Sequence, residues 1–421
     1  MKKKANSTAI IKRIFSSKIF LLFFFLFISP DIFASGDFSI HFNSSDFFFV
    51  LIPSAIVLLV LLAIKMAIKS LEKDLEQELE RVNNPSAFSE KIKNKIEELQ
   101  EIKSVLFYIS LIVVFFYVCY AFVKGTTLES HVTEWMNLVV RWVHIVFGIA
   151  WIGASFYFNF LENSLNRTKD LREGIAGNLW AVHGGGFYYL EKYKVAPTEI
   201  PKDLHWFKYE AYFTWVSGIA LLVIVYYLDA KAYLIDPAVL DISPTAAISI
   251  GVGSLIFGWI VYDFLCKSSL SKNPVLFGLI LFLFIIGASW FFSHVFNSRA
   301  AYIHVGALIG TWMVGNVFRV IIPSQKAMVN AAKAGKLVDP TLGKNALFRS
   351  KQNNYFTLPV IFIMISNHFP STYGNEFNWI VLIGLSLASV LVKHYLNLIE
   401  KGEKSVWILP AAVAGMIALL L

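Results

Sequence analysis

The chain has 421 residues, of which 57% are hydrophobic and only 16% charged, and its mean hydropathy is +0.61. Soluble domains are close to half apolar and a quarter charged, so this composition excludes a soluble globular protein and indicates a membrane protein. The formal net charge of +8 therefore predicts no nucleic-acid partner, because basic residues collect in the cytoplasmic loops of membrane proteins. Cys119 and Cys266 form no CxxC or CxxCH motif, which excludes a zinc ribbon and a covalently attached haem c.

Residues 1–34 have the pattern of a secretory signal peptide or of an uncleaved signal anchor. Five basic residues lie within positions 1–13, an apolar run covers 19–28, and small residues follow at 34 and 35. A basic flank, a short apolar core and small residues after it are typical of a signal sequence. Both interpretations stay open.

Residues 35–130 are expected to hold two transmembrane helices that flank a charged cytoplasmic helical segment. The apolar runs over 47–64 and 105–123 are long enough to cross the hydrocarbon core. Between them, leucines recur every four residues within a segment of alternating acids and bases over 65–103, which is helical spacing.

Residues 131–421 are expected to form a bundle of eight transmembrane helices. The apolar segments lie at 135–160, 211–228, 246–265, 274–292, 300–322, 355–369, 377–396 and 405–421. The loops between them alternate between basic and basic-poor, as the positive-inside rule requires of helices that cross in turn. The predicted fold class is therefore an all-α, polytopic membrane helix bundle with eight core helices, preceded by two more and a signal peptide or anchor. The even number places the C-terminus on the periplasmic side of a bacterial inner membrane.

Four histidines are candidate ligands of a cofactor in the membrane. Ionisable residues inside spanning helices are costly and tend to be functional. His144 lies near the middle of the first core helix, whereas His294, His304 and His368 are expected near the outer surface on three different helices. Imidazole binds iron, copper and zinc, so these side chains could bind either haem b or a single metal ion, with His144, His304 and His368 as candidates for the haem iron. A histidine that only hydrogen-bonds a neighbouring helix is the open alternative.

A second group of candidates lies on the cytoplasmic side. His183 precedes three glycines, which permit close approach of the backbone to a ligand. Four polar residues near the start of the sixth helix offer hydrogen-bond donors and acceptors to a flat, anionic heterocycle. They are Arg349, Asn353, Asn354 and Tyr355. Helix capping and contacts with membrane lipid headgroups are the alternative roles of the same residue types.

Five long stretches within residues 135–421 have a distinctive order. They are RWVHIVFGIAWIGASFYFNFLENSL (141–165), NLWAVHGGGFYYLEKY (178–193), LHWFKYEAYFTWVSG (204–218), RAAYIHVGALIGTWMVGNVFRVIIPSQ (299–325) and RSKQNNYFTLPVIFIMISNHFP (349–370). Together they resemble the membrane domain of the membrane-bound urate oxidase family, also called urate hydroxylase, and the similarity covers about 135–421.

The resemblance implies oxidation of urate to 5-hydroxyisourate in purine catabolism, with electrons passed through haem b to cytochrome c. In the family a cytochrome c domain commonly follows the last helix, whereas this sequence stops at Leu421 without a CxxCH motif. The expected acceptor is therefore a separate periplasmic cytochrome c. Gln352 departs from the family pattern, which favours a histidine there, and residues 1–130 lie outside the match.

The resulting hypothesis holds urate between the His183–Gly186 turn and the group of Arg349, Asn353, Asn354 and Tyr355, with His183 as the proton acceptor. Two alternatives stay open. The chain could be a transporter for purines or other organic anions, since polar residues within the membrane also serve permeation. It could instead be a b-type cytochrome subunit that relays electrons while catalysis occurs elsewhere.

Overall fold

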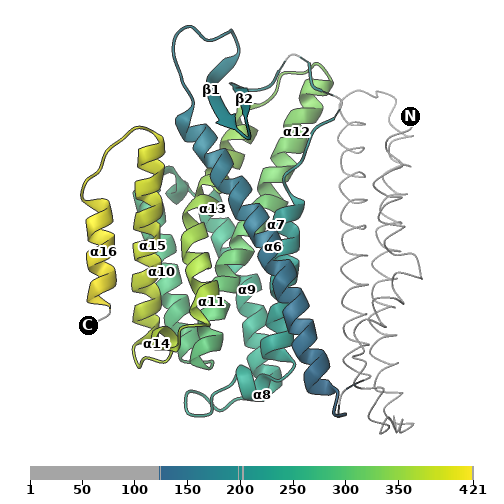
Figure 1. The fold of residues 1–421 in the computed structure, drawn as a ribbon, viewed down its shortest axis with the longest axis vertical. Helices are drawn as coiled ribbons and strands as arrows, with labels where there is room; N and C mark the ends of the chain where they lie inside the picture. Colours follow the sequence, from purple (N-terminus) through teal and green to yellow (C-terminus); the bar gives the residue numbers. More distant parts are fainter. Residues whose placement is uncertain (1–122, 124, 198, 202, 420–421) are drawn as a thin grey trace. The chain divides into compact units, whose positions relative to one another are not determined.

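The computed structural model describes residues 123–419, apart from 124, 198 and 202. The signal segment expected over 1–34, and nearly all of the two-helix region expected over 35–130, lie outside these residues. The part described is a bundle of long helices with one β-hairpin at one end (Figure 1).

Eight helices make up most of the bundle. They are α6 (Glu129–Ser164), α7 (Tyr209–Leu222), α9 (Pro244–Lys267), α10 (Pro274–Ser293), α11 (Ser298–Asn316), α13 (Pro340–Ser366), α15 (Asn378–Glu400) and α16 (Ile408–Ala418). The shorter elements are the helices α8 (Ala230–Tyr233), α12 (Ile322–Lys333) and α14 (Pro370–Tyr373), the 3-10 turn η2 (Ser269–Lys272), and the π-helical turns η1 (Val223–Tyr227) and η3 (Val317–Ile321). The turn η1 extends α7, and η3 joins α11 to α12 in one continuous rod.

The helix starts follow from local sequence. Four helices follow directly on a residue whose side-chain oxygen accepts a backbone N–H group of the first turn. These caps are Ser243 for α9, Asn273 for α10, Asn297 for α11 and Asp339 for α13. In α9, α10 and α13 a proline stands in that first turn, where its missing N–H costs nothing.

Six helices of the described part are long and apolar enough to cross a membrane, and the rod of α11, η3 and α12 counts as one of them. A helix is present at each of the eight ranges predicted from the sequence. However, α13 and α16 are not among the six, and α16 has only 11 residues. The structure therefore supports a multi-pass membrane protein, while the count of eight spans stays a prediction.

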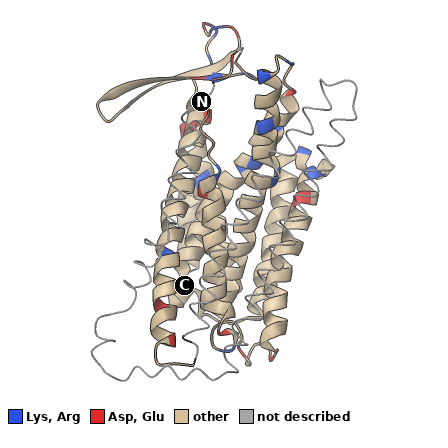
Figure 2. Ribbon diagram, turned by 90° about the vertical axis from the view of Figure 1, so that its right-hand side faces the viewer, with Lys and Arg blue, Asp and Glu red and all other residues tan. Residues whose placement is uncertain are grey.

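The outer surface of the bundle is apolar, as a lipid-facing surface must be. Large side chains such as Phe264, Val275 and Leu283 are more than 60% exposed. Soluble monomers rarely expose apolar areas of this extent. Lysine and arginine gather toward the end of the bundle that carries the hairpin, whereas the opposite end carries few (Figure 2). We call these the basic end and the opposite end.

The hairpin departs from the all-α expectation. Strands β1 (Ile175–His183) and β2 (Gly186–Tyr193) pair in antiparallel register, with His183 opposite Gly186. Gly184 and Gly185 form the two-residue turn with φ of 58° and 79°. Two-residue hairpin turns of type I′ require positive φ at both central positions, which glycine adopts without strain. The first two of the three glycines thus form a turn between two strands, and the third begins β2.

Helix α11 lies at the centre of the core, and α9 approaches it closely. Thirteen of its residues are buried, among them Trp312 and His304 at 0% exposure. A Cβ atom added to Gly258 of α9 would lie 2.2 Å from the Leu308 side chain of α11, and one added to Gly315 of α11 would lie 2.2 Å from the Trp259 ring of α9. Such small residues allow the two backbones to approach, which is the usual way in which membrane helices gain packing energy.

Candidate functional site

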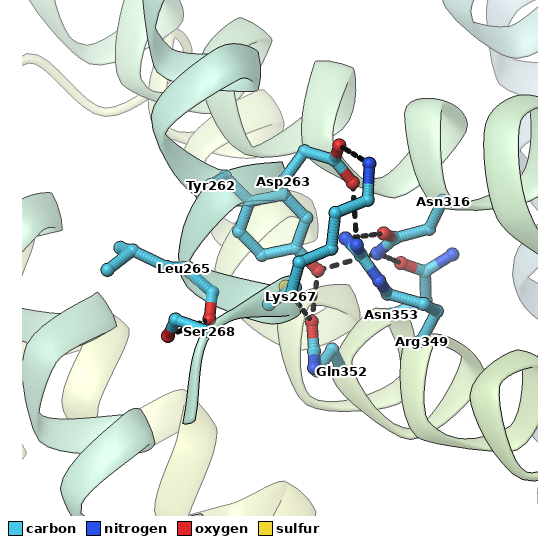
Figure 3. A network of polar contacts seen from close by, with 10 residues as sticks. Tyr262, Asp263, Leu265, Lys267, Ser268, Asn316, Arg349, Gln352 and Asn353 are labelled. Atoms are coloured by element: carbon cyan, nitrogen blue, oxygen red, sulfur yellow. Dashed lines mark hydrogen bonds and ion pairs between the residues drawn. The ribbon is translucent and has the colours of Figure 1, made fainter. Parts of the chain in front are cut away.

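A buried polar network joins α9, α11 and α13 near the basic end, with Arg349 at its centre (Figure 3). Arg349 is only 3% exposed. Its Nη2 donates to Oδ1 of Asp263 at 2.6 Å, and its Nη1 donates to Oδ1 of Asn316 at 3.0 Å. The second carboxylate oxygen of Asp263 accepts from Lys267 Nζ at 2.6 Å. One buried guanidinium therefore links three helices through charge-assisted bonds.

Side-chain amides extend this network into the core. The Nδ2 of Asn316 donates to the Tyr262 hydroxyl at 2.7 Å and to Oδ1 of Asn353 at 2.8 Å. Asn353 in turn donates to the Met313 carbonyl at 3.0 Å. The Tyr262 hydroxyl donates to Oε1 of Gln352, whose Nε2 is buried and has no hydrogen-bond partner in the described part of the chain. A buried donor without a partner is uncommon in proteins and marks a position where a ligand or water can bind.

A pocket of about 390 Å³ adjoins the network at Asp263. It lies between α9, η3 and α12, and its lining includes Trp259, Asp263, Lys267, Arg319, Pro323 and Ser324. Asp263 therefore belongs both to the pocket wall and to the network around Arg349.

The structure divides the four candidates on α13 into two pairs. Arg349 and Asn353 face α11 and belong to the network. Asn354 instead donates to Asn397 of α15 at 2.9 Å, and the Tyr355 hydroxyl bonds Nδ1 of His394 at 2.8 Å. Because successive residues of a helix point about 100° apart, neighbours in sequence contact different helices.

His183 belongs to the hairpin. It is exposed at the last position of β1, beside the hairpin turn. Among the described residues, no hydrogen bond joins it to Arg349, Asn353, Asn354 or Tyr355. The urate clamp expected between this turn and α13 therefore stays a prediction.

His304 is fully buried, and both of its ring nitrogens are engaged. Nδ1 lies 2.8 Å from the Ala300 carbonyl, which can only accept, so Nδ1 carries the proton. Nε2 lies 3.0 Å from the Tyr227 hydroxyl, which donates to it. Aromatic rings enclose the imidazole, and a Cβ on Gly251 would lie 2.9 Å from Nε2. This packing leaves neither a free nitrogen nor the space that a haem ligand requires.

The other three histidines have different surroundings. Half-buried His144 bonds α7 through Nδ1, at 3.0 Å from the Thr214 carbonyl and 3.1 Å from the Ser217 hydroxyl. His294 and His368 are exposed, and Nδ1 of His294 bonds the Trp290 carbonyl within its own helix. Within residues 123–419, no group of three or more His, Cys, Asp or Glu side chains is placed to hold a metal ion. Only His304 is shown with both ring nitrogens engaged, so haem ligation by His144, His294 and His368 stays a prediction.

Several network residues were not singled out by the sequence analysis. Tyr262, Asp263 and Asn316 lie inside the apolar segments 246–265 and 300–322, where polar side chains are costly. That rule, applied to acids and amides as well as to histidines, is the signal that could have found them.

Apolar helices around a buried polar network define a polytopic membrane protein with an internal polar site near one end. The model of the family described as "Urate oxidase N-terminal" matches residues 130–421, which include every helix and strand of the described part except the first residue of α6. The chain belongs to this family. No curated protein and no solved structure shows a significant match to it.

Proposed function

We propose that the membrane domain oxidises urate to 5-hydroxyisourate, with the network around Arg349 as the reaction site. Family membership supports a urate-related function. The observation that carries the choice of site is the buried position of Arg349, which is 3% exposed and supported on both sides by Asp263 and Asn316. A guanidinium with fixed orientation binds and positions a planar anion better than a mobile surface lysine does.

The proposed reaction adds water to urate and removes two electrons. A bond forms between C5 of the purine and the water oxygen, two protons are released, and two electrons leave. We propose a separate periplasmic cytochrome c as the acceptor, with two ferric haems reduced for each urate. Haem b remains the proposed relay, although His304 has no free ring nitrogen for its iron. No step is therefore assigned to it, and an absorbance spectrum of the reduced protein tests its presence.

The chain's own residues would act on charge and protons. Arg349 and Gln352 supply donors to an anionic purine, and the Nε2 of Gln352, which has no partner in the described part of the chain, would gain one on binding. Asp263, whose side chain is 20% exposed, connects the network to the pocket and offers a route by which released protons reach solvent.

We further propose that the domain lies in a bacterial inner membrane, with its basic end in the cytoplasm and its C-terminus in the periplasm. The gathering of lysine and arginine at the end with the hairpin supports this orientation (Figure 2). Reporter fusions at the hairpin and at the C-terminus test it, because each reporter is active on one side of the membrane only.

The decisive experiment incubates the purified full-length protein with urate and ferricytochrome c in the absence of oxygen. The expected result is loss of urate absorbance together with two reduced cytochromes per urate. Uptake of urate into proteoliposomes without product would instead identify a transporter. Reduction of cytochrome c that does not depend on urate would identify an electron relay.

A further inference from the structure

The pocket beside the network carries an excess of positive charge. Lys267 and Arg319 line the pocket. Asp263 is the one carboxylate in its lining, and Arg349 donates a hydrogen bond to this carboxylate from the core side. Three cations thus face one anion. Asp263 bonds both Lys267 and Arg349 at 2.6 Å, whereas no ion pair in the described part of the chain involves Arg319. The group lacks a negative partner, which an anionic ligand would supply.

Trp259 provides a flat apolar wall beside these charges. It lines the pocket, and Gly315 of α11 leaves the room in which its ring lies, since a Cβ there would fall 2.2 Å from the ring. A fixed indole next to a guanidinium and an ammonium suits a ligand that is both aromatic and negatively charged.

The position of Arg319 depends on an irregular turn. It lies in η3, a π-helical turn between α11 and α12. Single π-turns inside longer helices are often found at functional sites, because the extra residue changes the direction of side chains. Here the turn places Arg319 in the pocket wall, opposite the residues of α9.

We infer that this pocket is the binding site through which a planar organic anion reaches the network, with Arg319 and Lys267 holding its charge and Trp259 its ring. Its volume of about 390 Å³ lies within the range of small-molecule sites, roughly 300 to 1,000 Å³, and accommodates a bicyclic ring system. The identification of the anion as urate rests on the proposed function. The pocket itself rests on the geometry and charge described here.

The test is equilibrium binding of radiolabelled urate to the full-length protein in nanodiscs. Arg319→Gln and Lys267→Gln remove one charge each while keeping a polar, somewhat shorter side chain. We expect each to weaken urate binding about tenfold, the size of one charge-assisted contact at a partly exposed site. Lys333→Gln is the matched control, because Lys333 is an exposed lysine at the end of α12 outside the pocket. It should bind urate as the unchanged protein does.

Two further measurements examine the ligand class. Trp259→Leu should weaken the binding of urate more than that of inorganic phosphate, because only urate presents a ring face. Phosphate that competes as well as urate in the unchanged protein would show an unselective anion site and overturn the inference. So would unchanged urate binding in both Arg319→Gln and Lys267→Gln.

The outcomes separate this inference from the proposed function. Oxidation of urate with an unchanged KM in both pocket variants would leave the proposed function standing and refute the pocket. Selective loss of urate binding in those variants, in a protein that never oxidises urate, would support the pocket and refute the oxidase.

Discussion

Removing the guanidinium of Arg349 tests whether the buried network holds α9, α11 and α13 together. Arg349→Met keeps the apolar stem and deletes the bonds to Asp263 and Asn316. Breaking a buried ion pair costs about 3 to 5 kcal/mol. Asp263 keeps Lys267 and a 20% exposed side chain, so we expect the low end of that range. The loss of a partner for Asn316 Oδ1 acts in the same direction, and the expected total is about 3 kcal/mol.

The measurement is equilibrium unfolding in mixed micelles with increasing SDS, followed by tryptophan fluorescence. Lys267→Met is the matched control, because it bonds the same carboxylate from a side chain that is 70% exposed. Exposed ion pairs contribute about 1 kcal/mol or less, so this variant should unfold almost as the unchanged protein does. A double-mutant cycle with Asp263→Asn should give a coupling of about 2 kcal/mol between Arg349 and Asp263. Equal costs for Arg349→Met and Lys267→Met, or no coupling in the cycle, would refute the structural role of the network.

Three other predictions concern packing, the hairpin and pH. Gly251→Ala places a methyl group 2.6 Å from a tyrosine hydroxyl and should cost about 1 to 3 kcal/mol in the same unfolding assay. Gly253→Ala in the same helix is the control: its methyl group meets nothing within 4 Å, so this variant should be neutral or stabilising. Gly185→Val should strain the hairpin turn by about 1 to 2 kcal/mol, because φ there is 79°. The expected signature is faster amide hydrogen exchange confined to the two strands, and unchanged exchange would contradict the prediction. Hydrogen bonds from Arg172 hold the pKa of Glu191 below its usual value. The stabilisation is therefore present above the unfolded pKa of about 4 and is lost as the pH falls through the lower pKa of the folded state. Amide hydrogen exchange in the two strands should rise only in acid, and Arg172→Gln should abolish that rise.

The positions of the helices could be predicted from the sequence, because burial in lipid imposes a requirement on every residue of a span. A helix crossing hydrocarbon must be apolar over its length, and this leaves a pattern that needs no knowledge of neighbours. Each of the eight predicted ranges overlaps a helix, although α13 begins at Pro340, well before the predicted start at 355. The hairpin has a local signal too. Apolar and aromatic residues on both sides of a Gly-Gly pair predict a two-residue turn, which competes with the prediction of a ligand loop after His183.

The partners of each polar residue could not be read from the sequence. Asn353 and Asn354 are adjacent, yet one bonds α11 and the other α15, because a helix turns about 100° between them. Arg349 finds its carboxylate 86 positions away at Asp263. Hydropathy gives the depth of a residue along its helix but not its rotation about the helix axis.

The histidines show the same limit. The sequence placed His294, His304 and His368 near one end of their helices, but only the packed structure turned His304 inward, onto Tyr227, and left the other two exposed. What the sequence determined by itself is where the chain is apolar enough to lie in a membrane and to which family it is similar. Which polar groups meet inside was decided by the tertiary structure, because that depends on the rotation and close approach of helices that are distant along the chain.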